Sequence, residues 1–369
     1  MPVLRVRTHH SAEPLEHHRQ LAWALAEVAA DRAPVPAEAV AIIGERIIDN
    51  AARAAAALAR GATMSARVQA ALHSARPGAT VYGLSIHRRV SPDWAAWANG
   101  IAVRDARGHD SAVSGGDAQP LDSIGPILAV AQHCDRSGTD LIRGIAAAAE
   151  VQTALARGIG ANEHGLDTAI HLAPAVAAGI GALLALPVDT IDRAIRAALD
   201  VTATRPPPRR DLSWWRASAP AFAGKAAIEA VDRAMRGAPT PAPAYEGEDG
   251  IFAWMLRGEA AEYEIRLPAR GAPRTAIRDG SPAARTLRRP DDAFRARCAD
   301  VVPDFEQDRF LNTVHRLPRL SANDLFGLTF SVPPGSLPAP RRVGLFEGRT
   351  GTPPLPTRPA PALRLVEPT

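Results

Sequence analysis

The stretch DLIRGIAAAAEVQTALAR, residues 140–157, decides the fold class because it is typical of one long helix. Alanine fills its centre, and alanine loses no side-chain entropy when a helix forms. The whole chain of 369 residues is similarly rich in alanine, while aromatic residues make up only 5% of it. Short alternating runs of Thr, Val and Ile do not cluster, which argues against an all-β fold. We therefore expect a mainly α fold.

Apolar residues at helical spacing recur on both sides of this stretch. On the N-terminal side, helices fit residues 16–33, 36–58, 63–73, 91–100 and 125–133. On the C-terminal side, they fit residues 174–186, 190–201, 219–235, 251–256, 291–302 and 304–316. A β-prone run follows at 328–332. Gly100 either ends its helix or allows a second helix to pack closely.

Composition and charge exclude several classes of protein. The net charge is +4, but the arginines are scattered and are not interleaved with aromatics, so we expect no nucleic-acid partner. No window reaches about 18 uncharged apolar residues, so we expect no membrane span. The N-terminal stretch MPVLRVRTHHSAEPLEHH has no apolar region typical of a signal peptide. Cys134 and Cys298 have no metal-ligand spacing, which predicts reduced thiols in a cytoplasmic protein.

Several stretches carry a family resemblance. They are SPDWAAWANGIAVRD (91–105), DLIRGIAAAAEVQ (140–152), ARGIGANEHGLDTAIHLAPAVAAGIG (156–181), APAFAGKAAIEAVDRAMRG (219–237), YEGEDGIFAWMLRG (245–258) and EQDRFLNTVHRLPRLSANDLFGLTF (306–330). On these stretches the chain resembles the MmgE/PrpD family, and within it the actinobacterial type of 2-methylcitrate dehydratase. The resemblance implies a hydro-lyase of propionate catabolism that acts on a small polycarboxylate, needs no cofactor and forms a homodimer.

The resemblance also implies a large all-helical domain and a smaller α/β lid domain. Full-length relatives carry a long lid segment between the two matching regions, whereas only a short segment joins them here. We therefore predict a helical large domain at 1–258, an irregular remnant of the lid at 259–289, a helical segment with a short strand at 290–332, and a disordered Pro-rich tail at 333–369. A missing lid exposes apolar surface, so we expect a homo-oligomer that self-associates readily.

The reaction implied by the resemblance removes a proton next to a carboxylate and then expels hydroxide as water. It needs a general base, a general acid and cations that hold the substrate. In the family, the loop after the WANG helix reads roughly R-x-L-D-F-x-D-T and then H-P-G-D. The same frame here reads RDARGHDSAVSGGDAQPLDS (104–123). The loop therefore supplies the candidate residues Arg107, His109, Asp110, Ser111 and Gln119.

Two of these positions depart from the family pattern. Arg107 puts a fixed positive charge where the family has a carboxylate, and Gln119 replaces a histidine. An amide neither takes nor gives a proton near neutral pH. Because an acid–base group contributes about 10²- to 10⁴-fold to a rate, each change predicts a strong loss of turnover. Ser111 keeps the hydroxyl of the family threonine, while His109 and Asp110 are candidates for substrate binding.

The remaining candidates lie in three other stretches. His171 ends a D-x-x-x-H motif that the family shares, although by itself it reads as a satisfied histidine at a helix start. Arg216 stands at the family's S-x-W-K lysine, where a guanidinium holds a carboxylate but shuttles no proton. Arg205 precedes a stiff run of three prolines. Glu163 and His164 have no third ligand at a recognisable spacing, so we expect no metal.

Three hypotheses follow from these residues. The chain is a hydro-lyase with impaired turnover, a catalytically dead pseudoenzyme, or a protein that binds a polycarboxylate through Arg107, Arg205 and Arg216. The changes at Arg107 and Gln119 separate them, because an active enzyme needs a substitute base.

Overall fold

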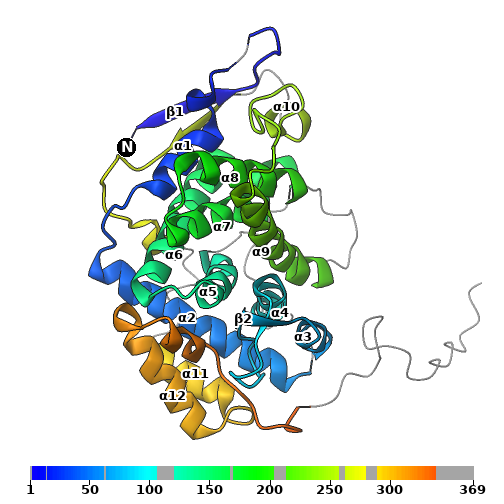
Figure 1. Ribbon diagram of the computed structural model, residues 1–369, viewed down its shortest axis with the longest axis vertical. Coiled ribbons are helices and arrows are strands. Elements are labelled where there is room, and N and C mark those ends of the chain that lie inside the picture. Colours follow the sequence, from blue (N-terminus) through cyan, green and yellow to red (C-terminus); the bar gives the residue numbers. More distant parts are fainter. Residues whose placement is uncertain are drawn as a thin grey trace, which may run out of the picture.

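The computed structural model describes residues 2–13, 15–61, 64–105, 120–166, 169–202, 213–256, 262–279 and 289–337. This part of the chain is mainly helical with a small sheet, which confirms the predicted fold class (Figure 1). The tail predicted at 333–369 lies outside the described residues from 338 onward.

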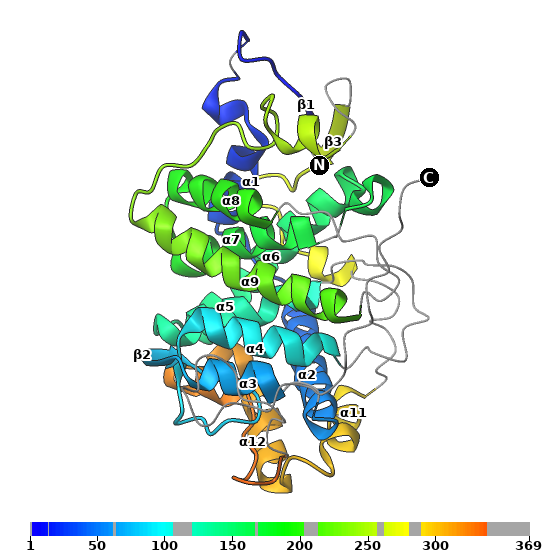
Figure 2. The same ribbon diagram turned by 90° about the vertical axis from the view of Figure 1, so that its right-hand side faces the viewer.

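The centre of the molecule is a layer of packed helices. It consists of α1 (Leu21–Ala30), α6 (Gly138–Gly158), α7 (Ala169–Leu184), α8 (Val188–Thr202) and α9 (Ser213–Met235) (Figure 2). α6 begins with a capping box, in which the Asp140 amide donates to Ser137 Oγ at 3.2 Å and the Ser137 amide donates to Asp140 Oδ2 at 3.1 Å. A Cβ on Gly179 would lie 2.7 Å from the Gly144 carbonyl oxygen, so this glycine lets α6 and α7 approach closely.

A second group of helices packs beneath this layer. It contains α2 (Ala37–Ala59), α3 (Met64–Ala71), α4 (Pro92–Asp105) and α5 (Ile124–His133). α4 crosses α9 at Gly100, where an added Cβ would lie 2.9 Å from the Ala221 Cβ. Gly100 lies inside α4, so the structure selects close packing over the helix end as the role of this residue.

The C-terminal helices α11 (Pro290–Cys298) and α12 (Asp304–His315) lie at the end of the molecule opposite the sheet and pack against α2 (Figures 1 and 2). Phe294 contacts the rings of Phe310 and Phe330 at centroid distances of 4.8 and 6.3 Å. Residues 328–332 form no strand, contrary to the prediction from their composition. Leu328 ends a 3₁₀ helix, and the Phe330 carbonyl accepts the Gly83 N–H at 2.9 Å instead of a strand partner.

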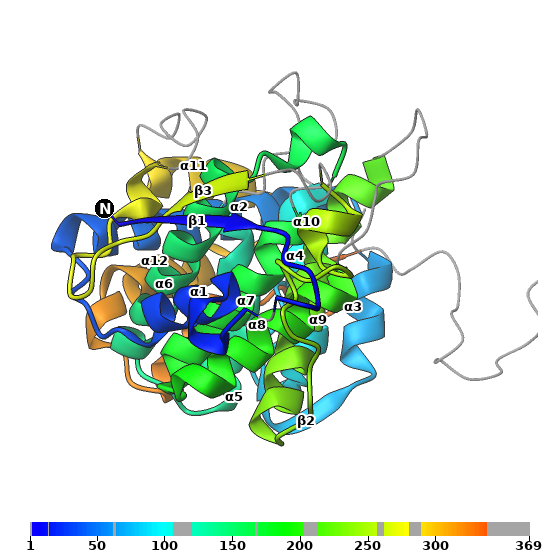
Figure 3. The ribbon, with the colours of Figure 1, turned by 90° about the horizontal axis from the view of Figure 1, so that it is seen from above.

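The sheet joins two distant parts of the chain. β1 (Val3–Arg7) pairs antiparallel with β3 (Glu262–Arg266), with Val6 opposite Tyr263, and this ribbon lies over the helical layer (Figure 3). Two further short elements, β2 (Ser74–Ala79) and α10 (Ile251–Trp254), lie at the periphery. The segment predicted as irregular at 259–289 thus contains a strand, and it also contains a 3₁₀ helix at Ala276–Asp279.

In the described residues, every helix is too short or too polar to span a bilayer.

Candidate functional site

Most of the predicted site residues lie outside the described part of the chain. Arg107, His109, Asp110, Ser111, Gln119 and Arg205 belong to the segments 106–119 and 203–212, and the Arg216 side chain is also not described. What the structure places is the framework to which these segments attach. That framework is the end of α4 and the 3₁₀ helix Pro120–Ser123 on either side of segment 106–119, and the end of α8 and the start of α9 on either side of segment 203–212. The 3₁₀ helix packs against both α7 and α9, and α8 also packs against α9.

A buried ion pair ties the two ends of segment 106–119. Arg104, in the last turn of α4, donates from Nε to Asp122 Oδ1 at 2.7 Å, and its Nη2 donates to Asp122 Oδ2. The two side chains are 10% and 3% exposed. A bidentate arginine–carboxylate pair is strong and fixes geometry. The pair therefore holds together the two flanks of the segment that carries five candidate residues.

His171 is the one predicted site residue whose side chain the structure describes. It lies in the first turn of α7, is 4% exposed, and its Nε2 is 2.9 Å from the Ile159 carbonyl oxygen. A carbonyl oxygen only accepts, so Nε2 carries the proton and Nδ1 remains an acceptor. Burial lowers the pKa of His171 to about 4, although the bond to Ile159 raises it. The imidazole is therefore neutral near pH 7, which allows it to take a proton but not to give one.

The surroundings of His171 link the large domain to β3. Ile159 caps the C-terminus of α6, and the following 3₁₀ helix Ala161–His164 places the His164 ring edge-on to Tyr263 of β3, at 6.2 Å between centroids. Tyr263 also stacks on Phe252 at 4.9 Å. β3 therefore packs against the 3₁₀ helix that follows Ile159, the hydrogen-bond partner of His171.

A cluster of side chains at the start of α4 has no recognisable signature in the sequence. Lys225, the one lysine of the chain, places Nζ 2.8 Å from Asp93 Oδ2 and 3.7 Å from the centroid of the Trp94 ring. Burial alone would raise the pKa of Asp93, but hydrogen bonds from Lys225 and Ser91 lower it below its ordinary value. Trp94 stacks on His73 at 4.2 Å. The cluster joins α4 to α9 at the end of α4 opposite Arg104.

Glu246 is a second group that sequence patterns did not reveal. It is 1% exposed, and its Oε1 accepts the Leu21 N–H at 2.6 Å at the start of α1. Burial raises its pKa to about 7, and the charge of Asp192 raises it further. Asp192 itself pairs with Arg196 and His17. The stretch YEGEDG reads as a polar loop, so only the packing of the folded chain shows that this carboxyl is buried.

One comparison with known proteins bears on this framework. A family model described as the MmgE/PrpD N-terminal domain matches residues 19–264. The match includes all the predicted site residues, the Arg104–Asp122 pair and His171, and it ends inside β3.

Proposed function

Since this chain belongs to the MmgE/PrpD family, we propose that it is a hydro-lyase of the 2-methylcitrate dehydratase type with impaired turnover. Membership of the family supports a hydro-lyase-like function in general, and the substrate and the impairment are the proposed part. The observation that carries the proposal is the neutral imidazole of His171, held by its Nε2–H, with Nδ1 left as an acceptor.

The chemistry explains why turnover is impaired. A base removes the proton next to a carboxylate, the electron pair forms the carbon–carbon double bond, and the hydroxyl leaves as water after an acid protonates it. A pKa of about 4 makes His171 a weak base near pH 7. Gln119 supplies neither an acid nor a base, and Arg107 replaces a carboxylate. The site therefore contains one weak base, His171, and none of its described residues is identified as the general acid.

A turnover assay tests this proposal. The purified chain is mixed with 2-methylcitrate, and the new conjugated double bond is followed by ultraviolet absorbance. We expect very slow turnover in the native chain, and a rise of about 100-fold or more in the double variant Arg107→Asp/Gln119→His, because acid–base groups contribute about 10²- to 10⁴-fold. The matched control, Arg236→Asp/Gln69→His, changes the same residue types elsewhere and should leave the rate unchanged. Fast turnover in the native chain, unaffected by the double variant, would contradict the impairment.

A second candidate is a protein that binds a polycarboxylate without converting it. The substitutions themselves favour it, because Arg107 and Arg216 both provide guanidinium groups where the family has a carboxylate and a lysine. Guanidinium groups bind carboxylates in a bidentate manner. Calorimetric titration with 2-methylcitrate decides between the two candidates. Binding that is weakened by Arg216→Gln, with no turnover even in the Arg107→Asp/Gln119→His variant, would support the binding protein.

A further inference from the structure

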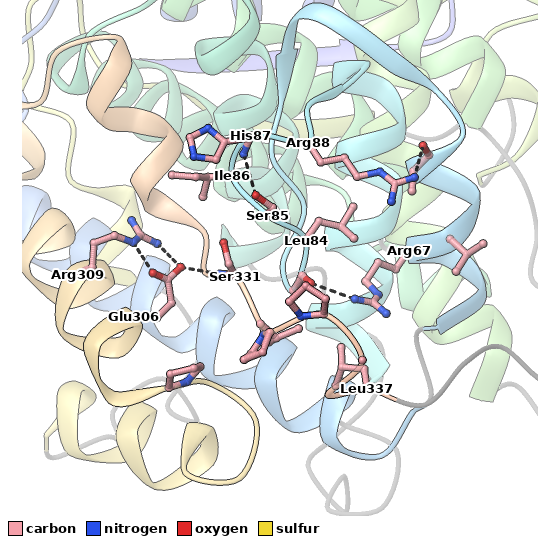
Figure 4. A pocket seen from close by; sticks show the side chains of 18 of the residues that line it. Arg67, Leu84, Ser85, Ile86, His87, Arg88, Glu306, Arg309, Ser331 and Leu337 are labelled. Atoms are coloured by element: carbon pink, nitrogen blue, oxygen red, sulfur yellow. Dashed lines mark hydrogen bonds and ion pairs between the residues drawn. The ribbon is translucent and has the colours of Figure 1, made fainter.

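A groove with a volume of about 800 Å³ opens between α3, residues 83–88 and residues 331–337 (Figure 4). Its walls are largely apolar and include Val68, Leu72, Leu84, Val332 and Leu337. Volumes of this size are typical of pockets for small organic ligands. The groove is therefore large enough for an elongated molecule with an apolar body.

The groove is separate from the candidate site described above. Residues 83–88 precede the N-terminus of α4, whereas segment 106–119 begins after its C-terminus at Asp105. None of the described residues that line the groove belongs to the candidate site, and Arg104, Asp122 and His171 are not among them.

Two arginines hold positive charge at the α3 side of the groove. Arg67 donates from Nη1 to the Gly83 carbonyl at 3.0 Å, and Arg88 donates from Nη2 to the Ala71 carbonyl at 3.2 Å (Figure 4). Burial lowers the pKa of Arg67, and the charge of Arg88 lowers it further. Both arginines line the groove, so an anion bound between them would be attracted by two positive charges.

The opposite wall carries a carboxylate that is already neutralised. Glu306 accepts from Arg309 Nε at 2.7 Å and from Arg309 Nη2 at 2.8 Å, and its Oε1 accepts the Ser331 N–H at 2.6 Å. Among the described residues that line the groove, Glu306 is the only acid. The lining therefore carries a net positive charge.

The groove is preformed by contacts within the fold. The Gly83 N–H donates to the Phe330 carbonyl at 2.9 Å, and the Tyr82 and Phe330 rings pack at 5.2 Å between centroids. Arg309 also donates to the Gly327 and Thr329 carbonyls. These bonds hold the two walls in place, so a ligand would not need to order them on binding.

We propose that this groove binds a monocarboxylate with an unbranched apolar chain. The carboxylate lies between Arg67 and Arg88, whose planar guanidinium groups match carboxylate geometry. The apolar chain lies along Leu72, Leu84 and Leu337 and is thereby removed from water. This binding is independent of the proposed hydro-lyase activity.

Calorimetric titration of the full chain with octanoate and with 1-octanol tests this proposal. The two probes share the apolar chain and differ in charge. We expect octanoate to bind at least 10-fold more tightly than octanol. Arg88→Gln should reduce octanoate affinity to the level of octanol, whereas Arg236→Gln, which removes an exposed arginine elsewhere, should change neither.

A second variant tests the proposal independently, in case Arg88→Gln does not fold. Ser85→Glu adds a negative charge at an exposed position of the lining without removing any hydrogen bond donated by arginine. It should weaken octanoate by a similar factor and leave octanol unchanged. Absence of octanoate binding, equal affinity for the two probes, or octanoate affinity unchanged in both folded variants would overturn the proposal.

Discussion

Two buried ionisable residues favour their neutral forms and oppose each other in the pH dependence of stability. Glu246 has a pKa of about 7 in place of 4.5, and His171 has a pKa of about 4 in place of 6.5. Folded Glu246 keeps a proton that the unfolded chain loses above 4.5, so its contribution to stability falls as pH rises towards 7. The unfolded chain protonates His171 below 6.5 and the folded chain does not, so that contribution falls as pH drops towards 4.

Replacing Glu246 by a residue that does not ionise should therefore reduce the loss of stability between pH 5 and pH 8. In Glu246→Gln, the amide oxygen still accepts the Leu21 N–H, but the side chain at this position no longer ionises. From pH 5 to pH 8, we expect the free energy of unfolding of the native chain to fall by on the order of 2–3 kcal/mol relative to the variant. Urea unfolding at the two pH values measures this difference. The control is Glu248→Gln, an exposed neighbour, and curves that run parallel for Glu246→Gln and the native chain would refute the assignment.

The Arg104–Asp122 pair leads to a second prediction at the residue scale. Asp122→Asn leaves the Arg104 guanidinium buried without its charge partner, and breaking a buried pair on one side costs about 3–5 kcal/mol. Asp232→Asn is the matched control, because its Arg236 partner is 75% exposed and surface pairs contribute about 0–1 kcal/mol. Urea unfolding measures both losses. Equal losses in the two variants would show that Arg104–Asp122 does not anchor the fold.

The candidate site could be predicted only where a residue stands in a family motif. His171 was identified from D-x-x-x-H, and its burial and hydrogen bond agree with the satisfied histidine that its position also suggested. Glu246 and Lys225 gave no such signal. Their partners, Leu21 and Asp93, are distant in sequence, so only folding brings these groups together.

At the scale of elements, the helical periodicity predicts the helices well but misplaces three starts. It places them at residues 16, 174 and 219, whereas α1 begins at Leu21, α7 at Ala169 and α9 at Ser213, and Pro174 and Pro220 lie inside their helices. Proline fits the first turn of a helix and removes one hydrogen bond elsewhere. In α7 the buried side chains on all faces compensate for that loss, and such packing is not visible in local sequence.

The strands were missed for a related reason. The short runs VLRVR and EYEIR are separated by most of the chain, and a strand is stable only when it has a partner. Conversely, residues 328–332 have strand-like composition but pair with no strand in the described part of the chain. Pairing depends on long-range contacts, which local composition does not report.

The crossing of α4 and α9 gives a prediction at this scale. Alanine normally stabilises a helix by about 1 kcal/mol relative to glycine. At Gly100, however, the new Cβ would lie 2.9 Å from the Ala221 Cβ and 3.0 Å from its Cα, so the helices must separate. We expect Gly100→Ala to destabilise the protein by roughly 1–3 kcal/mol. Gly125→Ala in α5 meets no atom within 4 Å and should be neutral or stabilising. Thermal unfolding of both variants measures the contrast, and similar shifts in Tm would contradict close packing at Gly100.

At the scale of the whole molecule, several large apolar side chains remain exposed. Phe222 on α9 is 49% exposed beside the Trp97 ring, and Trp254 and Phe305 are 71% and 74% exposed. Such surfaces favour association. We expect the chain to form oligomers that grow with concentration in light scattering, and we expect Phe222→Ser to reduce them. A monodisperse monomer at all concentrations would defeat this expectation.

Hydrogen bonds fasten residues 274–276, just beyond the C-terminal end of the family match, to the helical layer. Arg274 is 3% exposed, and its Nη2 donates to the Val28 carbonyl at 2.6 Å and lies 3.3 Å from Asp31 Oδ2. On the other side, Glu150 Oε1 accepts the N–H groups of Thr275 and Ala276 at 2.6 and 2.9 Å. Residues 262–279 are thus bound to α1 and α6 as well as to β1.

Substitution of Arg274 tests whether residues 259–289 behave as a connecting segment or as part of the helical domain. Arg274→Met removes the guanidinium while keeping an unbranched apolar chain, and Asp31 then keeps the hydrogen bond from the Gly271 N–H at 2.7 Å. Because loss of one partner of a buried pair is strongly destabilising, we expect a loss of about 3 kcal/mol in urea unfolding. We also expect faster proteolysis around residues 270–276, because this stretch then loses the Arg274 hydrogen bonds to Val28 and Asp31. Arg270→Met, four residues away and exposed, is the control. If both variants unfold and are cleaved alike, the segment only connects its neighbours, as its composition suggests. If only Arg274→Met is weakened, the segment belongs to the helical domain and stabilises the packing around His171.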